Sequence, residues 1–433
     1  MQALYYIAVL IFGGLIFARL VGKLNLPDVT GYLLAGLVLG PWVSGLLPES
    51  AVSSLGIISQ VALSLIAFSI GNEMKIDNLK RLGSGILIVT ICEALGAFFV
   101  VTAGLILIFK SSVSFALVLG SIACATAPAS TLLVIKQYRA KGELVDVLLP
   151  VVALDDAVCI MVFGIASSVA RSLTSGEELQ YLPMLLNPLK DIVLAVLLGA
   201  IAGFVGAHVL RFLKNEQSMI SFMIASIFGL TALTLYVDIS SLLTLMVFGF
   251  TMGNLQGTTR RYQQLLDPIT PPIFIAFFVL SGADLNLSQL TAVGALGIFY
   301  IIARVLGKAL GAFLGTKKAG FSKEVQKYLG FTLMPQAGVA IGLSLLAVRI
   351  LPAPEARMVR TIILAATLIY ELLGPLVAKL VLEKAGCIES KKTLKAGADT
   401  AAMAYNPPST LARKKAKLKG EEKAKQLDET EDK

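Results

Sequence analysis

The chain has 433 residues, of which 56% are apolar and only 15% are charged, whereas a soluble globular protein is about 25% charged. This composition excludes an ordinary soluble enzyme. The net charge of +9 would suit nucleic acid, but 13 of the 37 lysines and arginines follow Glu371, so the excess is local and we expect no nucleic-acid partner.

Thirteen apolar runs cover most of the chain and predict membrane helices, which need about 20 apolar residues each. The first run begins almost at Met1 without a basic segment before it, so we expect no cleavable signal peptide. The ninth and tenth runs are short. The predicted spans are 3–22, 28–47, 51–71, 83–109, 113–137, 145–170, 189–213, 217–236, 240–254, 269–282, 290–315, 327–350 and 358–382.

The basic residues of the loops predict the orientation in the bilayer, because cytoplasmic loops carry an excess of Lys and Arg. With the N-terminus outside, the inner loops carry 16 such residues and the outer loops 6. An odd number of spans then leaves the basic C-terminal tail in the cytoplasm. We expect a multi-pass protein of the cell (inner or plasma) membrane, with the lipid bilayer as its partner.

Weak self-similarity relates the two halves of the membrane region. Gly36 and Gly40 are four residues apart, as are Gly249 and Gly253, and similar segments follow each pair in the same order. Six spans per half with one span between them imply inverted repeats. We therefore predict an all-α polytopic protein of two inverted repeats, with repeat one at 1–170, a linking helix at 189–213, repeat two at 217–383, a transport domain of 1–383 and a disordered basic tail at 384–433.

Two of the spans are interrupted at corresponding positions by proline. Pro128 lies between Thr126 and Ser130, and Pro335 precedes Gln336. Proline removes a backbone donor and frees a carbonyl, and unwound backbone at membrane depth lasts only inside protein or beside a wet cavity. Interrupted helices at matching repeat positions indicate the binding site of a secondary transporter. We expect two crossing discontinuous helices, with Thr126 steadying the break or offering an oxygen to an ion.

Six charged residues fall inside the spans, where charges are rare and usually functional. Four acids and two bases leave this layer two negative charges in excess, which suits cations or protons. Adjacent aspartates point about 100° apart on a helix, so one can face a basic partner while the other faces an ion path. Lys308 paired with an aspartate is the expected ion pair, and a structural role suits Arg304. The six are Glu93, Asp155, Asp156, Arg304, Lys308 and Glu371.

The residues around Thr126–Ser130, Asp155–Asp156, Arg304–Lys308 and Pro335 resemble the monovalent cation:proton antiporters of the second cation:proton antiporter family over residues 1–383. The resemblance implies the sodium/proton antiporter-like fold, a homodimer, Asp156 as the main cation and proton carrier, and Asp155 as the partner of Lys308. Relatives in the potassium-efflux branch have Gln-Asp at the pair and a nucleotide-binding domain. The segment after the last span has no GxGxxG motif, so we expect no such domain.

We therefore expect an antiporter, not an enzyme, that exchanges Na⁺, or K⁺, for H⁺ by alternating access with net charge movement and without a cofactor. Carboxylate and carbonyl oxygens serve both cations, so the sequence leaves this choice open. A sodium-coupled symporter of an organic anion and a cation channel are the alternatives. An intramembrane aspartyl protease would need its two aspartates on different helices, and no GxGD motif is present.

Overall fold

The computed structural model describes residues 2–175, 181–213, 215–256, 265–285, 294–347 and 350–388. The chain divides into two units, 1–388 and 389–433, and the predicted tail from residue 389 onward lies outside the described residues. Within the described residues the chain forms seventeen helices and no strand.

The thirteen predicted spans all correspond to helices, as predicted for an all-α polytopic protein. Eight are single helices long and apolar enough to cross a membrane, three are shorter, and two are broken into halves. The long helices are α1 (Gln2–Lys23), α4 (Gly56–Glu73), α6 (Gly85–Leu107), α9 (Glu143–Ser175), α10 (Tyr181–Leu210), α11 (Glu216–Val237), α16 (Gly294–Ala319) and α19 (Ala353–Lys384). The short ones are α2 (Asp28–Leu39), α12 (Ser241–Gln256) and α14 (Thr270–Ala283), and the broken spans are α7 (Val113–Ile122) with α8 (Pro128–Tyr138) and α17 (Lys323–Thr332) with α18 (Gly338–Leu346).

Several predicted bounds shift by a few residues, α10 begins at Tyr181 and not at residue 189, and two spans are shortened or interrupted. The second was expected to reach residue 47, but α2 ends at Leu39 with Gly40 as its cap. Pro41 follows, and the residue before a proline is disfavoured in helical conformation. The third was expected to be continuous from residue 51, but a short helix, α3 (Glu49–Ser54), is separated from α4 by Leu55. A further short helix, α5 (Ile76–Leu82), joins α4 to α6.

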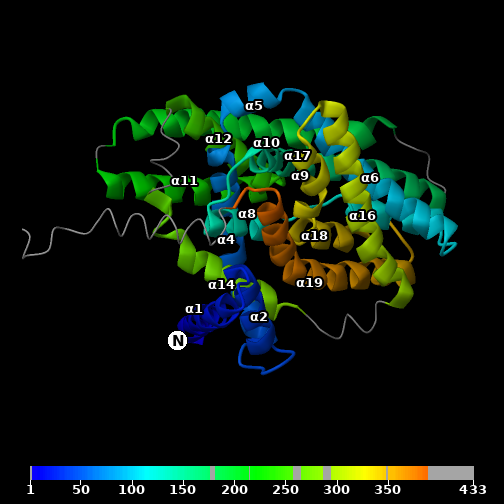
Figure 1. The fold of residues 1–433 in the computed structure, drawn as a ribbon, viewed down its shortest axis with the longest axis horizontal. Helices are drawn as coiled ribbons and strands as arrows, with labels where there is room; N and C mark the ends of the chain where they lie inside the picture. The colour runs from blue at the N-terminus through cyan, green and yellow to red at the C-terminus, as the bar shows by residue number, and fades with distance from the viewer. Residues whose placement is uncertain are drawn as a thin grey trace, which may run out of the picture. The chain divides into compact units, whose positions relative to one another are not determined.

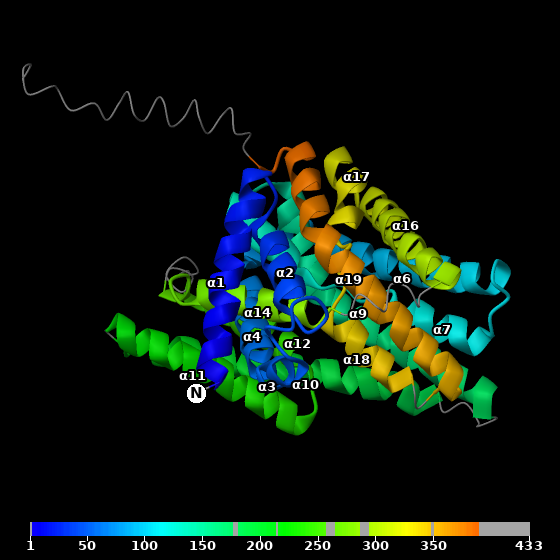
Figure 2. The same ribbon diagram turned by 90° about the horizontal axis from the view of Figure 1, so that it is seen from below.

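The helices pack mainly within two groups, which we call the core bundle and the panel. The core bundle contains α6 to α9 and α16 to α19, and its most extensive contact joins α6 to α16. The panel contains α1, α2, α4, α11, α12 and α14, and α10 packs both on α12 of the panel and on α9 of the core bundle. Figures 1 and 2 show α6 beside α16 in the core bundle and α1 beside α2 in the panel.

The repeat glycines are contact points between the two halves. A Cβ on Gly36 would overlap the backbone of α14 at Val279, and one on Gly249 would overlap the backbone of α4 at Phe68. The second helix of each repeat thus packs on the third helix of the other. Such reciprocal packing is what a pseudo-two-fold relation between inverted repeats produces, and it confirms the predicted fold class.

Candidate functional site

The two broken helices meet at their interruptions, which we call the crossing. α7 ends at Ile122 and α8 begins at Pro128. The Ala127 N–H donates a hydrogen bond of 2.9 Å to the Pro335 carbonyl in the other break. Gln336 strengthens the junction, because its Nε2 donates to the Ile122 carbonyl at 2.9 Å. The sequence placed Pro128 within the break, whereas it opens the second half-helix, a position where its missing N–H costs nothing.

Arg304 of α16 satisfies the carbonyls that the crossing leaves free. Its Nε donates to the Ala123 carbonyl at 3.0 Å, its Nη1 to Met334 at 2.7 Å and its Nη2 to Ala125 at 2.6 Å. The guanidinium also lies over the Tyr370 ring, 4.7 Å from its centre. The C-terminal ends of α7 and α17, where helix dipoles are negative, therefore share one buried cation. This geometry makes Arg304 a structural clamp on both breaks.

Lys308, one turn after Arg304, lies between two buried carboxylates. Its Nζ is 2.6 Å from Glu93 Oε2 on α6 and 3.5 Å from Asp155 Oδ2 on α9. All three side chains are at most 1% exposed. The sequence favoured an aspartate as the partner, but the shorter contact is with Glu93. The difference arises because α6 and α16 pack closely through glycines, which brings Glu93 nearer than α9 can bring Asp155.

Asp156 is 4% exposed and makes no ion pair or hydrogen bond with any residue that the structure describes. Asp155 and Asp156 thus diverge, as their 100° separation requires: one contacts Lys308 and the other does not. Glu93, Asp155 and Asp156 would carry three negative charges, and among the described residues only Lys308 forms ion pairs in this group, because Arg304 donates to backbone carbonyls instead. Buried charges must be compensated, so this cluster needs a proton or a cation.

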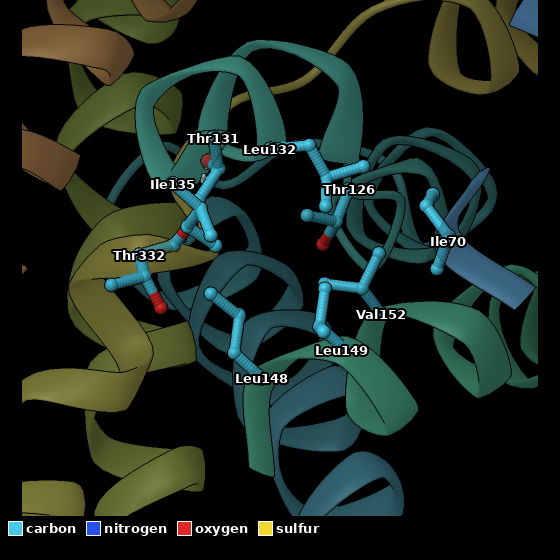
Figure 3. Close-up of a pocket in the computed structure, with 9 residues that line it drawn as sticks. All are labelled: Ile70, Thr126, Thr131, Leu132, Ile135, Leu148, Leu149, Val152 and Thr332. Carbon is cyan, nitrogen blue, oxygen red and sulfur yellow. Dashed lines mark hydrogen bonds between the residues drawn. The ribbon is translucent and has the colours of Figure 1, made fainter. Parts of the chain in front are cut away.

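Thr126 lies in the first break with its hydroxyl buried and unpartnered among the described residues. It lines a small cavity, which Figure 3 shows bounded by α8 on one side and by Leu148, Leu149 and Val152 of α9 on the other. The Thr126 oxygen points into this cavity (Figure 3). Val152 is one helical turn before Asp156, so the two residues lie on the same side of α9, although Asp156 itself does not line the cavity.

Ser130 and Glu371 complete the predicted set. Ser130 lies in the first turn of α8, after the break, with its hydroxyl buried and unpartnered within the described chain. Glu371 lies in α19, outside the group around Lys308. The structure therefore brings together Glu93, Asp155, Asp156, Lys308 and the crossing. Sequence reasoning did not single out Tyr300, whose hydroxyl exchanges hydrogen bonds with Gln336, because nothing in a membrane-helix tyrosine indicates its partner.

Comparison with known proteins finds one matching family model and relatives that are named as cation/H⁺ antiporters. The family model described as "Sodium/hydrogen exchanger, transmembrane" matches residues 7–384. The ammonium/H⁺ antiporter subunit AmhT of Alkalihalophilus pseudofirmus is 25% identical over 75% of this chain and 81% of its own length. The high-affinity Na⁺/H⁺ antiporter NhaS3 of Synechocystis is 23% identical over 74% of this chain and 77% of its own.

A solved structure of similar fold is that of the sodium proton antiporter MjNhaP1 from Methanocaldococcus jannaschii. It superposes with a TM-score of 0.66 at 18% identity, over 89% of this chain and 96% of that one. The identity is low, so this likeness concerns the fold. The family model, in contrast, spans most of the sequence. The chain belongs to the transmembrane sodium/hydrogen exchanger family.

Proposed function

We propose that the protein exchanges a monovalent cation, with Na⁺ favoured over K⁺, for protons across the membrane. The observation that carries the proposal is the buried, unpartnered carboxyl of Asp156 beside the Lys308 cluster. A desolvated carboxylate without a counter-charge is costly, so it holds either a proton or a cation. Competition of the two for one carboxyl couples their movements.

Lys308 provides a second coupling. Asp155 is the more distant of its two carboxylate partners, at 3.5 Å against 2.6 Å for Glu93. When a cation binds Asp156, its positive charge attracts the neighbouring Asp155 and weakens the contact between Asp155 and Lys308. When the cation leaves, the contact between Asp155 and Lys308 forms again. The Thr126 hydroxyl, which points into the cavity, is available as an additional oxygen ligand.

Exchange also requires the site to face each side of the membrane in turn. The division into core bundle and panel supports a movement of the first against the second, since the charged cluster and the crossing belong entirely to the core bundle. We place the N-terminus outside and the basic loops in the cytoplasm, in a plasma membrane, and we expect a homodimer and net charge movement. The basic-residue asymmetry of the loops supports this orientation.

The relatives add one cation to the candidates. Their names specify Na⁺/H⁺ exchange in NhaS3 and ammonium/H⁺ exchange in AmhT, so ammonium joins K⁺ as a competitor to test. All three are monovalent cations that oxygen ligands can bind. No organic solute is needed in this scheme, which separates it from a symporter.

The test is exchange in proteoliposomes containing a pH-sensitive dye, with Na⁺, Li⁺, K⁺, Rb⁺ and NH₄⁺ supplied in turn. Wild-type protein should move protons on addition of the preferred cation, and Asp156→Asn should reduce the signal to that of protein-free liposomes. Asp146→Asn is the matched control, because Asp146 lies on the same helix but pairs with Arg81 outside the site. Normal exchange in Asp156→Asn would contradict the proposal, as would a requirement for an organic solute.

A further inference from the structure

A second buried carboxyl lies outside the Lys308 cluster. Glu371 of α19 is 6% exposed and forms no ion pair or hydrogen bond with the described residues. The three cations that are buried among the described residues are already engaged. Lys308 is shared by Glu93 and Asp155, Arg304 binds carbonyls, and Lys379 donates to the Asn25 carbonyl.

The contacts of α19 define the direction in which Glu371 points. Tyr370 faces Arg304, and a Cβ on Gly374 would touch Pro335, so these two residues mark the side toward the crossing. Lys379 marks the side toward the α1–α2 loop of the panel. With 100° per residue, Glu371 lies about 60° from Gly374 and about 80° from Lys379. It therefore occupies the edge of α19 between the crossing and the panel.

A polar neighbour shares this edge. Thr367 is one turn before Glu371, on the same side of the helix, and is 4% exposed with its hydroxyl unpartnered in the described chain. A hydroxyl and a neutral carboxyl can each donate and accept hydrogen bonds, whereas a carboxylate only accepts. None of the described residues forms an ion pair with Glu371 or donates a hydrogen bond to it. Burial here therefore favours the neutral acid.

We propose that Glu371 is a second proton-binding site, separate from Asp156, which holds a proton while α19 is closed on α2 of the panel and returns it to water when that contact opens. The opening movement rests on the proposed function, but the protonation does not. None of the titratable residues on the helices packed against α19 pairs with Glu371. They are Tyr300, Arg304, Lys308, Lys317 and Lys318 on α16, Asp28 and Tyr32 on α2, Lys136 and Tyr138 on α8, and Lys323, Glu324, Lys327 and Tyr328 on α17.

The first test is the thermal stability of the purified full-length protein between pH 6 and pH 9. Glu371→Gln keeps the shape of the neutral acid but cannot ionise. Its Tm should equal that of the wild type at pH 6 and exceed it at pH 9, because only the wild type must then bury a charge or retain a proton. Glu355→Gln, at the start of the same helix and hydrogen-bonded to Ser112, should follow the wild type at both pH values.

Exchange in proteoliposomes is the second test. The ratio of activity at pH 9 to activity at pH 7 should be at least threefold higher in Glu371→Gln than in the wild type, and Glu371→Asp should restore the wild-type profile. Identical pH dependence of Tm and exchange in Glu371→Gln and wild type would overturn the proposal. A Glu371→Gln protein that is unstable at every pH would overturn it as well. If no exchange is seen in any variant, the proposed function fails, but the Tm comparison still decides this site.

Discussion

One ammonium group compensates two buried carboxylates in this protein. Lys308 is 2.6 Å from Glu93 and 3.5 Å from Asp155, and none of the three is solvated. Removing one partner of a buried ion pair generally costs about 3–5 kcal/mol. Here the loss would leave two carboxylates close together in an apolar setting. The lysine therefore serves stability as well as transport.

Replacing Lys308 separates these roles. Lys308→Gln should lower Tm strongly at pH 8 and much less at pH 5, because the remaining carboxylates repel unless they are protonated. It should also change the charge moved per exchanged cation, measured as the response of exchange to an imposed membrane potential. Lys318→Gln, in the exposed last turn of α16, should alter neither. An unchanged charge per cycle in Lys308→Gln would argue against coupling through this residue.

Some of the site could be predicted from single residues. Asp155, Asp156 and Lys308 are visible because charges are scarce in apolar spans, and the breaks are visible as prolines. The carboxylates that pair with Lys308 could not be predicted. Whether Glu93 or Asp155 lies nearer to Lys308 depends on the rotation and spacing of α6, α9 and α16. The partners of Arg304 could not be predicted either, since they are backbone carbonyls that become free to accept a hydrogen bond only where the helices are broken.

At the scale of elements, glycine sets how closely the charged helices approach. A Cβ on Gly311 of α16 would overlap the Cys92 carbonyl of α6 and lie 2.8 Å from Glu93 Cα. A Cβ on Gly307 would lie 2.7 Å from Ala97 Cα on α6. The distance from Lys308 to Glu93 thus depends on residues that carry no side chain. The sequence shows these glycines, but it does not show which helix they approach.

Gly311→Ala should therefore destabilise the protein by about 1–3 kcal/mol, the usual cost of overpacking, and slow exchange by displacing Glu93. The matched control is Gly229→Ala on α11, where no atom lies within 4 Å of an added Cβ. That change should be neutral or slightly stabilising, since alanine favours helix over glycine. Thermal unfolding of both variants measures the difference. Equal effects would show that the α6–α16 contact tolerates separation.

At the scale of the whole membrane unit, a group of polar contacts joins the core bundle to the panel, and we call it the clasp. Lys379 of α19 donates to the Asn25 carbonyl and lies 5.3 Å from the centre of the Tyr138 ring. The Asp28 N–H at the start of α2 donates to Gln137 Oε1 of α8 at 3.0 Å. These contacts close the junction of α2, α8 and α19 on one side of the molecule.

Lys379→Gln should weaken the contact between α19 and the α1–α2 loop. A hydrogen bond from a charged group contributes about 1.5–3 kcal/mol, so local opening should become about tenfold or more frequent. Hydrogen–deuterium exchange of the segments 24–28 and 136–142 should rise accordingly. Lys384→Gln, at the exposed end of the same helix, should leave both segments as protected as in the wild type. Unchanged protection in Lys379→Gln would show that the clasp does not hold the two groups together.

The reciprocal packing of the glycine helices also constrains how the protein is made. α2 fits against α14, and Gly36 and Val279 are more than 200 residues apart in the chain. At a synthesis rate of about 5–20 residues per second, α2 waits roughly 10–50 s for its partner. The first half leaves the ribosome with an unfilled glycine face and cannot complete its own packing. Assembly must finish late, after the second half is inserted, so damage to α14 would trap the whole chain as an incompletely folded intermediate.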